Sequence, residues 1–492
     1  MKLNKLFGTA ERLRARPDAV CNHEGGLAFK ADPQLELYLR ACSCLIEDRF
    51  YTRAESQLAE LRAAISQCDR SYVLKLANYA RNEMQLRTLP MILLAEASVM
   101  HGGASNESKS DVRRYVPAIV RRADEPGELL AYWIQTLGAG TKAKLPNALK
   151  KGLSDALKRF DEYQLAKYNR AGNVRLKDVL MLVHAKPETP ERAWLYKRVL
   201  EDKLATPETW EVMISTQGSN AANWNAIAPK MGIMALVRNL RNFEKHDAQE
   251  ALLHAIGVLT DPERVRDSKL LPFRWLAAER EVSSGLLKDA LREAMNLSLA
   301  NVPVWQGRTA IFVDLSGSMS SALSKQSKLM YVDVASLMGA MATRLAQGEY
   351  LVGGFGESYA DIPVSRHDSV LTNTEKIRHT HVGHSTNAWL TIESLRKRKK
   401  VFDRVLIFSD MQCYSTQGYG QQSLAEEWIR YRKEVNPQAL LYSVDLAGYG
   451  TLQFPQGDSG VVQLAGWSER VLDLVSAFEG RQSAVEMIKE KY

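Results

Sequence analysis

The chain has 492 residues, of which 45% are hydrophobic and 25% are charged, with a formal net charge of +8 and a pI near 9.0. These values are those of an ordinary soluble globular protein of two to four domains, and they exclude a disordered or fibrous chain. The positive balance suits an anionic partner, but a modest charge alone is weak evidence for one.

Apolar runs and cysteines restrict the compartment. No run reaches the roughly 18 residues that a membrane span needs, and the closest, Leu89 to Met100, contains Glu96. The first residues lack the apolar core of a secretory signal. The five cysteines are odd in number and lack metal-ligand spacing, so we expect free thiols in a reducing, cytoplasmic setting. They are Cys21, Cys42, Cys44, Cys68 and Cys413.

Residues 30–300 have apolar side chains at helical spacing in one segment after another, with short connections that contain Gly, Asn, Pro or Asp. Paired helices of about 12 residues with brief turns predict a HEAT-like α-solenoid. No clean repeat period is visible. The expected helices include 34–46, 52–68, 71–82, 89–101, 111–122, 126–137 and 145–160.

Residues 142–177 form a basic segment, with ten Lys or Arg against three acidic residues. Tyr163, Tyr168 and two asparagines are interleaved with these cations. Such a surface can neutralise phosphates and stack on exposed bases, although a solvated helix face gives the same composition. The run Arg396 to Lys400 is explained in part by the dipole at a helix C-terminus.

Two further polar features remain ambiguous from the residues alone. His184 follows an apolar run, where a lone histidine is more often structural than a contact residue. The stretch 235–242 places Arg238, Arg241 and Asn242 on adjacent faces of one helical turn. These side chains could cap neighbouring helices or line a polar channel.

The pattern changes to alternating strands and helices near Asn301 to Trp305, which is where we place a domain boundary. Strand–helix alternation predicts a doubly wound parallel sheet. The expected strands are 310–313, 350–355, 403–410 and 439–446, and the expected helices are 328–347, 423–435 and 468–478.

Polar oxygens gather where two of these strands end. Asp314, Ser316 and Ser318 follow the first strand, and Asp410 ends the strand that begins at 403. A loop at 384–387 adds the hydroxyls of Ser385 and Thr386. In open α/β sheets ligands bind at this edge, and carboxylates with hydroxyls suit Mg²⁺. The alternative for the first motif is an N-cap turn.

This arrangement resembles the metal-ion-dependent adhesion site of von Willebrand factor A domains. In that pattern a Thr followed by Asn or Asp supplies the middle ligand, which selects Thr386 over Ser385. Asp410 is then the last ligand. Such a site binds through its metal and usually performs no chemistry, so the resemblance favours recognition over catalysis.

The whole chain resembles the TROVE-module proteins, the Ro autoantigen and its bacterial counterparts. The resemblance rests on residues 22–29, 235–242 and 268–275, followed by an A domain, and it spans about residues 15–480. It implies a ring of HEAT-like helices, the TROVE module, at 15–300 and an α/β doubly wound von Willebrand factor A domain at 301–492.

The resemblance also implies RNA binding without catalysis. A small non-coding Y-like RNA is expected on the outer basic surface, and single-stranded 3′ ends of misfolded RNA in a central hole. The positions expected to contact Y-like RNA are Lys142, Lys144, Lys167, Arg170, Lys177 and His184. For the hole we expect Arg238, Arg241 and Asn242.

Further partners follow from the same resemblance. The bound RNA could tether an exoribonuclease such as polynucleotide phosphorylase, and an acidic residue of a protein ligand could complete the coordination of Mg²⁺. The chain is expected to be a cytoplasmic monomer that acts in RNA quality control.

Two other classes of function remain open. The first is a metal-dependent protein-binding module that binds no RNA. The second is a nuclease that uses a metal between Asp314 and Asp410. His379, His381 and His384, which lie near Thr386 in sequence, keep this possibility open. Against the nuclease, the site is rich in hydroxyls and offers too few carboxylates for a second metal.

Overall fold

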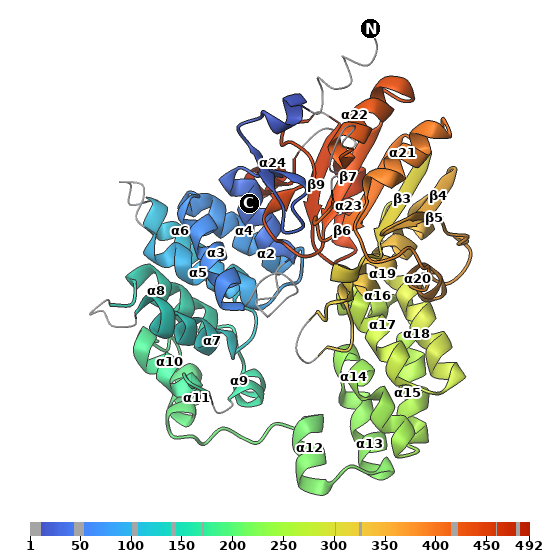
Figure 1. Ribbon diagram of the computed structural model, residues 1–492. Helices are drawn as coiled ribbons and strands as arrows, with labels where there is room; N and C mark the ends of the chain where they lie inside the picture. The colour runs from blue at the N-terminus through green and yellow to red at the C-terminus, as the bar shows by residue number, and fades with distance from the viewer. Residues whose placement is uncertain are drawn as a thin grey trace. The chain divides into compact units, whose positions relative to one another are not determined.

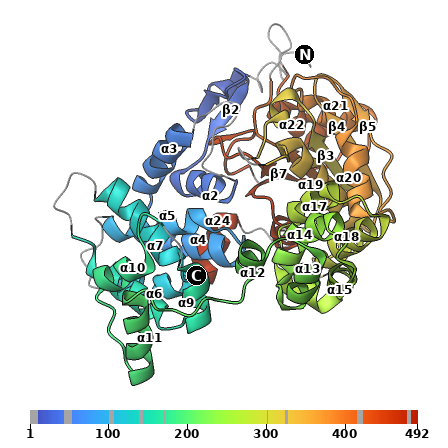
Figure 2. The ribbon, with the colours of Figure 1, turned by 90° about the horizontal axis from the view of Figure 1, so that it is seen from below.

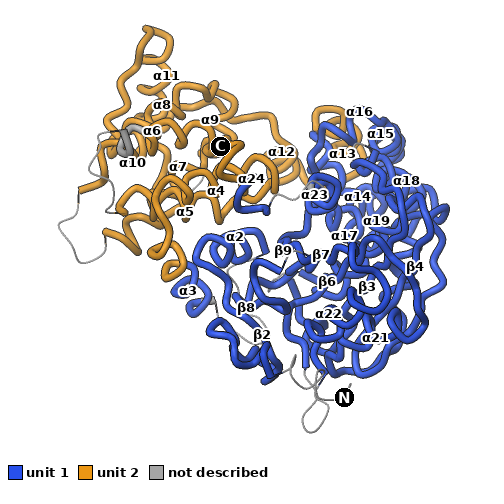
Figure 3. Tube along the Cα trace, turned by 90° about the horizontal axis from the view of Figure 1, so that it is seen from above, with its two compact units in different colours: residues 1–61, 232–487 blue, residues 62–231, 488–492 orange. Residues whose placement is uncertain are grey.

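A computed structural model describes residues 11–43, 54–100, 107–138, 144–169, 172–300, 302–323, 327–414, 422–458, 460–478 and 483–492. The chain forms two compact units, residues 1–61 with 232–487, and residues 62–231 with 488–492 (Figure 3). We call them unit 1 and unit 2 and describe each by itself.

Unit 2 is built from short helices that pack on their neighbours, as α4 packs on α5 and α6, and α6 on α8. α4 begins after Asp69, whose carboxylate accepts the Tyr72 amide, and its apolar residues form one buried face. The helices are α4 (Arg70–Asn82), α5 (Thr88–Val99), α6 (Glu107–Ile119), α7 (Glu125–Tyr132), the π-helix η1 (Trp133–Leu137), α8 (Asn147–Leu157), α9 (Glu162–Tyr168), α10 (Leu176–Val183), α11 (Pro190–Leu200), α12 (Trp210–Gln217), α13 (Ala221–Ile227) and the 3₁₀ turn η2 (Ala228–Lys230). Two helices cross the division between units, α3 (Ala54–Ser66) and α24 (Ala484–Lys491).

The predicted helices of this region are confirmed to within a few residues at their ends. The segment expected at 34–46 is α2 (Pro33–Ser43), a helix of unit 1, and the last three residues of that expected segment lie outside the described part. The single helix expected at 126–137 is α7 continued by the π-turn η1.

Unit 1 also contains helices, and these adjoin its α/β part. α14 packs on α15 and α17, while α17 contacts α19 and α18 contacts α20. The change from helices to strands lies where the domain boundary was expected, near residue 301, which itself is outside the described residues. That this position separates two domains remains a prediction. The helices are α14 (Ile233–Lys245), α15 (Gln249–Leu259), α16 (Pro262–Ser268), α17 (Pro272–Glu281) and α18 (Gly285–Ser298).

The α/β part is a six-stranded sheet in the order β5-β4-β3-β6-β7-β9 (Figure 1). All neighbours are parallel except β5, a short antiparallel edge strand that the sequence did not reveal. Its strands are β3 (Thr309–Asp314), β4 (Tyr350–Phe355), β5 (Tyr359–Asp361), β6 (Arg404–Ser409), β7 (Leu440–Asp445) and β9 (Val461–Ala465). Its helices are η3 (Gly317–Ser320), α19 (Tyr331–Leu345), α20 (Val370–Arg378), α21 (Trp389–Lys397), α22 (Leu424–Glu434) and α23 (Arg470–Phe478).

Helices cover both faces of this sheet. Figure 2 shows α21 and α22 on one side and α19 with α20 on the other. Every residue of β3 and β6 is therefore buried, which explains their continuous apolar runs. The doubly wound architecture predicted from strand–helix alternation is confirmed.

A second, three-stranded sheet was not predicted. β1 (Ala19–Cys21) and β2 (Leu27–Lys30) form an antiparallel hairpin, and β2 pairs with β8 (Thr451–Leu452) of the α/β part. Strands of two to four residues leave too short a pattern for recognition from sequence.

The described cysteines, Cys21, Cys42, Cys68 and Cys413, are free thiols as expected, while Cys44 lies outside the described residues. Among the helices that the structure describes, none combines the length and apolar composition of a membrane span.

Candidate functional site

The predicted metal ligands meet at one edge of the six-stranded sheet. β3 and β6 are adjacent parallel strands, paired from Thr309 with Arg404 to Val313 with Phe408. Their carboxyl ends therefore lie together, with Asp314 closing β3 and Asp410 directly after β6.

The loop that contains Thr386 is fastened to both of these strand ends. The Gly317 amide donates to the His384 carbonyl at 2.8 Å, and the Tyr414 amide donates to the Thr386 carbonyl at 2.8 Å. Thr386 is buried, as are Ser316 and Ser318. The structure thus brings all five predicted side chains to the same edge.

Hydrogen bonds fix the orientation of the two carboxylates. Asp314 accepts the Ser409 hydroxyl at 2.7 Å and the Ser316 amide at 3.0 Å. Asp410 accepts the Gln412 amide at 3.0 Å and a hydrogen bond from the Ser318 hydroxyl. Both carboxylates are buried, so these bonds hold their oxygens inside the strand edge rather than in solvent.

The electrostatics of this edge favour a cation. Burial raises the pKa of the Asp314 carboxyl, and burial together with the charge of Asp314 raises the pKa of Asp410. Neither carboxylate forms an ion pair with any residue in the described ranges. Two buried carboxylates that repel each other are costly unless a positive charge compensates them.

Three hydroxyls and two carboxylates are hard oxygen donors, so the residues present fit Mg²⁺. Within the described ranges no three His, Cys, Asp or Glu side chains gather into a metal-binding group. A donor set in which hydroxyls outnumber carboxylates agrees with that finding.

The predicted RNA-binding residues of unit 2 differ in whether an acidic residue already pairs with their positive charge. Lys144 is exposed before α8, while Lys142 and Arg170 lie outside the described residues. Lys167 on α9 lies 5.7 Å from the ring centres of both Tyr163 and Tyr168. Lys177 on α10 is already paired with Asp202 at 2.7 Å.

His184 is exposed and ends α10 in the left-handed conformation, with φ of 52°. Its amide donates to the last turn of the helix, so its backbone has a structural role at the C-terminus. The side chain remains available at the surface.

The turn between α6 and α7 adds basic residues that the sequence analysis missed. The Arg122 guanidinium lies 4.4 Å from the ring centre of Tyr168, the ring that Lys167 also approaches. Burial lowers the pKa of Arg159, and the nearby charge of the exposed Arg121 lowers it further. We call Arg121, Arg122, Arg159 and Lys167 the basic cluster. In the sequence, the two consecutive arginines Arg121 and Arg122 were the feature that could have indicated this cluster.

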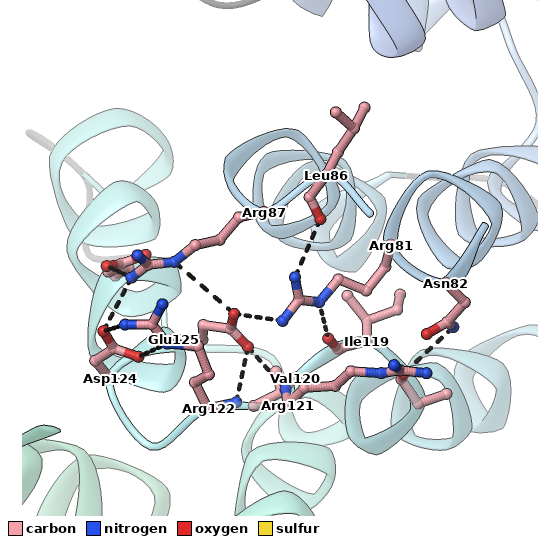
Figure 4. A network of polar contacts seen from close by, with 12 residues as sticks. Arg81, Asn82, Leu86, Arg87, Ile119, Val120, Arg121, Arg122, Asp124 and Glu125 are labelled. Atoms are coloured by element: carbon pink, nitrogen blue, oxygen red, sulfur yellow. Dashed lines mark hydrogen bonds and ion pairs between the residues drawn. The ribbon is translucent and has the colours of Figure 1, made fainter. Parts of the chain in front are cut away.

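A buried ion pair supports this turn (Figure 4). Glu125, fully buried at the start of α7, accepts Arg81 Nη2 at 2.6 Å and the amides of Arg121 and Arg122 at 2.7 and 3.0 Å. Arg81 in turn donates to the Ile119 and Leu86 carbonyls. One carboxylate thus fixes the backbone that presents half of the basic cluster.

The residues predicted for the hole lie on α14 in unit 1. Arg241 pairs with Glu281 at 2.7 Å, and the side-chain Nδ2 of Asn242 donates to Asn239 Oδ1 at 2.9 Å. Arg238 is exposed and has no ion-pair partner in the described part of the chain. Surrounding protein atoms exclude water from part of Arg274 and lower its pKa, although the residue as a whole is exposed. The charge of Arg238 lowers this pKa further.

Short helices packed on their neighbours, together with a doubly wound α/β domain, define the class of protein as a helical module joined to an α/β domain. Comparison with known proteins gives the family. A family model described as the TROVE domain matches residues 46–202 and 190–346, and one described as the Ro60 vWA domain matches residues 308–479. The chain belongs to the TROVE family, and its α/β part is a von Willebrand factor A domain of the Ro60 type.

The fold is similar to that in the crystal structure of the Ro (RSR) protein of Deinococcus radiodurans. The TM-score is 0.63 at 16% sequence identity, over 91% of this chain and 98% of that one. The matching fold and the two family models support the expected relationship to bacterial Ro proteins. They also confirm the predicted combination of a helical-repeat module with an A domain.

Parts of the chain are similar to telomerase protein component 1, at 25% identity over 316 residues in Mus musculus and 34% over 121 residues in Rattus norvegicus. These matches cover 47% and 24% of this chain, and 12% and 4% of those much longer proteins. Membership of the TROVE family supports RNA binding as the general function.

Proposed function

We propose that this chain binds a small structured Y-like RNA, without catalysis, on the surface of unit 2 that contains the basic cluster. The observation behind this proposal is the arrangement around Tyr168, where Arg122 and Lys167 approach one ring. Cations held beside aromatic rings suit the phosphates and exposed bases of folded RNA.

The charges of the cluster are not all available to RNA. Arg122 pairs with Asp124 at 2.7 Å, whereas Lys167 and Arg121 have no carboxylate partner among the residues described. Unpaired cations release counterions from phosphates without first breaking an internal ion pair. Lys167 and Arg121 should therefore contribute most to the affinity.

The resemblance to Ro proteins supports a second RNA site, for single-stranded 3′ ends of misfolded RNA, in the central hole expected of a helical ring. Arg238 is the strongest candidate there, because it has no ion pair in the described chain and its neighbour Arg274 is also cationic. Selectivity would come from strandedness rather than base reading.

The strand edge of the A domain would hold Mg²⁺ through Asp314, Ser316, Ser318, Thr386 and Asp410. The bound cation would supply an open coordination position for an acidic residue of a protein ligand. An adaptor role toward an exoribonuclease such as polynucleotide phosphorylase, in the cytoplasm and as a monomer, completes this proposal for RNA quality control.

The test is RNA pull-down with sequencing, comparing the wild type with an Arg121→Ala/Lys167→Ala variant at two salt concentrations. We expect a small structured RNA to be enriched by the wild type and lost from the variant. In titrations with that RNA, removing two phosphate contacts should reduce the slope of log affinity against log salt by about 1.5 to 2.

Lys197→Ala is the matched control, because Lys197 is an exposed lysine on α11 that pairs with Glu201 at 3.8 Å. Equal enrichment by wild type and the double variant would reject the basic cluster as the RNA surface. Equal loss in the control would mean that total charge, and not this cluster, determines binding.

A further inference from the structure

The N-terminal hairpin touches the loop that contains a predicted metal ligand. β1 and β2 are joined by a turn at residues 22–26, in which Gly25 has φ of 73°. Asn22 organises this turn, because its side-chain oxygen accepts the amides of Glu24 at 3.1 Å and Gly26 at 2.8 Å.

The same asparagine reaches across to the loop after β6. Its Nδ2 donates to the Cys413 carbonyl at 2.7 Å, and both groups are buried. The His23 amide donates to Gln412 Oε1 at 2.9 Å, and the Tyr414 hydroxyl bonds to Glu24. Three consecutive loop residues are thus held by three consecutive residues of the hairpin.

This loop determines where two of the expected metal ligands lie. The backbone amide of Gln412 donates to the Asp410 carboxylate at 3.0 Å, and the backbone amide of Tyr414 donates to the Thr386 carbonyl at 2.8 Å. A displaced 412–414 segment would therefore release one bond to Asp410 and one to the Thr386 loop together.

The hairpin is itself anchored to the α/β part by pairing of β2 with β8, where Phe29 faces Leu452 and both are buried. His23 also packs edge-on against Tyr449, with ring centres 5.5 Å apart. The turn at 22–24 consequently has a fixed position from which to hold the loop.

We propose that the N-terminal hairpin is part of the cation site, with Asn22 as a positioning residue that holds the Asp410 and Thr386 loops in binding geometry. This inference rests on the proposed Mg²⁺ site. Groups that orient metal ligands without touching the metal commonly change metal affinity about tenfold to a hundredfold when removed. By thermodynamic linkage, Mg²⁺ must then stabilise the docked hairpin to the same extent.

The experiment measures Mg²⁺ affinity of the full chain by titration calorimetry. Asn22→Asp keeps the acceptor oxygen that forms the turn and replaces the donor to Cys413 with a carboxylate oxygen, so the turn should still form while its contact with the loop is lost. Its added negative charge alone would attract Mg²⁺, so binding at least tenfold weaker than wild type would report the broken contact between the hairpin and the loop. Asn22→Ala should weaken binding as well.

Arg16→Ala is the control, because Arg16 forms an exposed pair with Asp18 at 2.8 Å before β1 and makes no described contact with the 412–414 loop. We expect its Mg²⁺ affinity to equal that of wild type. If both Asn22 variants bind Mg²⁺ as the wild type does, the inference is wrong while the cation site stands. If the wild type binds no Mg²⁺, the cation site and the inference are both wrong.

Hydrogen exchange of the wild type provides a readout that does not depend on any variant folding. Mg²⁺ should slow exchange of the His23 and Gly26 amides, while amides of α4 in unit 2 should exchange unchanged. Hairpin amides that exchange equally fast with and without Mg²⁺, in a protein that binds Mg²⁺, would overturn the inference even if Asn22→Ala proved unstable.

Discussion

The buried Arg81–Glu125 pair gives the sharpest prediction for unit 2. Glu125→Ala leaves the Arg81 guanidinium, 10% exposed at its side chain, with its charge uncompensated. Removing one partner of a buried ion pair costs about 3–5 kcal/mol. The amides of Arg121 and Arg122 lose their acceptor as well. A fully buried orphan costs about 1–3 kcal/mol, and these partly exposed amides cost less.

These costs are not additive, because the turn can open to water once the carboxylate is gone. We therefore expect unit 2 to lose about 4–6 kcal/mol, a large part of the 5–15 kcal/mol that stabilises a typical domain. Urea unfolding together with hydrogen exchange in α4, α6 and α7 measures this loss. RNA binding should weaken too, because Glu125 holds the backbone of the Arg121–Arg122 turn.

Three companion variants make the measurement specific. Asp155→Ala breaks the Arg113–Asp155 pair, whose 2.6 Å contact lies at the surface, and should destabilise unit 2 far less than Glu125→Ala does. Glu125→Gln retains an acceptor for the amides and should fall between the two. An Arg81→Met/Glu125→Leu double variant should recover much of the loss. If Glu125→Ala is no more destabilising than Asp155→Ala, this view of the pair is refuted.

Other parts of the chain give three further predictions. Asp202→Ala should raise RNA affinity a few-fold in titrations, because it frees Lys177 from its ion pair; unchanged affinity would place Lys177 outside the RNA surface. In Asp333, burial raises the pKa, but hydrogen bonds from Arg280 and the charge of Arg378 bring it below its ordinary value of 3.8. The carboxylate thus stabilises unit 1 above about pH 4, and this contribution is lost as pH falls through the lowered pKa. Urea unfolding should show Asp333→Asn to be less stable than wild type at pH 7 and the difference shrinking below pH 4; a constant difference would contradict this. Finally, chelation of Mg²⁺ should lower the melting temperature of the wild type but leave Asp314→Ala unchanged, and an equal decrease in both would argue against the strand-edge site.

The meeting of these polar side chains at one strand edge was predictable because its pattern is local. An apolar run followed by Asp314, Ser316 and Ser318 identifies both a strand and the polar edge at which it ends. A second strand that ends beside Asp410 then needs only the general rule that parallel strands present their carboxyl ends together. The structure brings these residues together as that rule requires, with Thr386 held between them by backbone hydrogen bonds.

The basic cluster was only partly predictable, because charge density does not reveal which cations are already paired. Lys167 and Lys177 look alike in sequence, yet Asp202 neutralises one of them and no described carboxylate reaches the other. Arg122 lies far from the basic segment along the chain but stacks on Tyr168 within it. Such pairings depend on how helices pack, which periodicity alone does not specify.

The turn at residues 22–26 differs from both cases. Its residues formed part of the family resemblance, and the Asn22 side-chain oxygen bonds amides of the turn itself, but nothing near them in sequence identifies the acceptor of the Asn22 Nδ2. The partner is the Cys413 carbonyl, 391 residues away. A short polar motif can thus belong physically to a site at the other end of the chain, because a hairpin of a few residues is stable when a third strand pairs with it. Pairing with β8 supplies that strand, and it brings the Asn22 donor to the loop of Asp410.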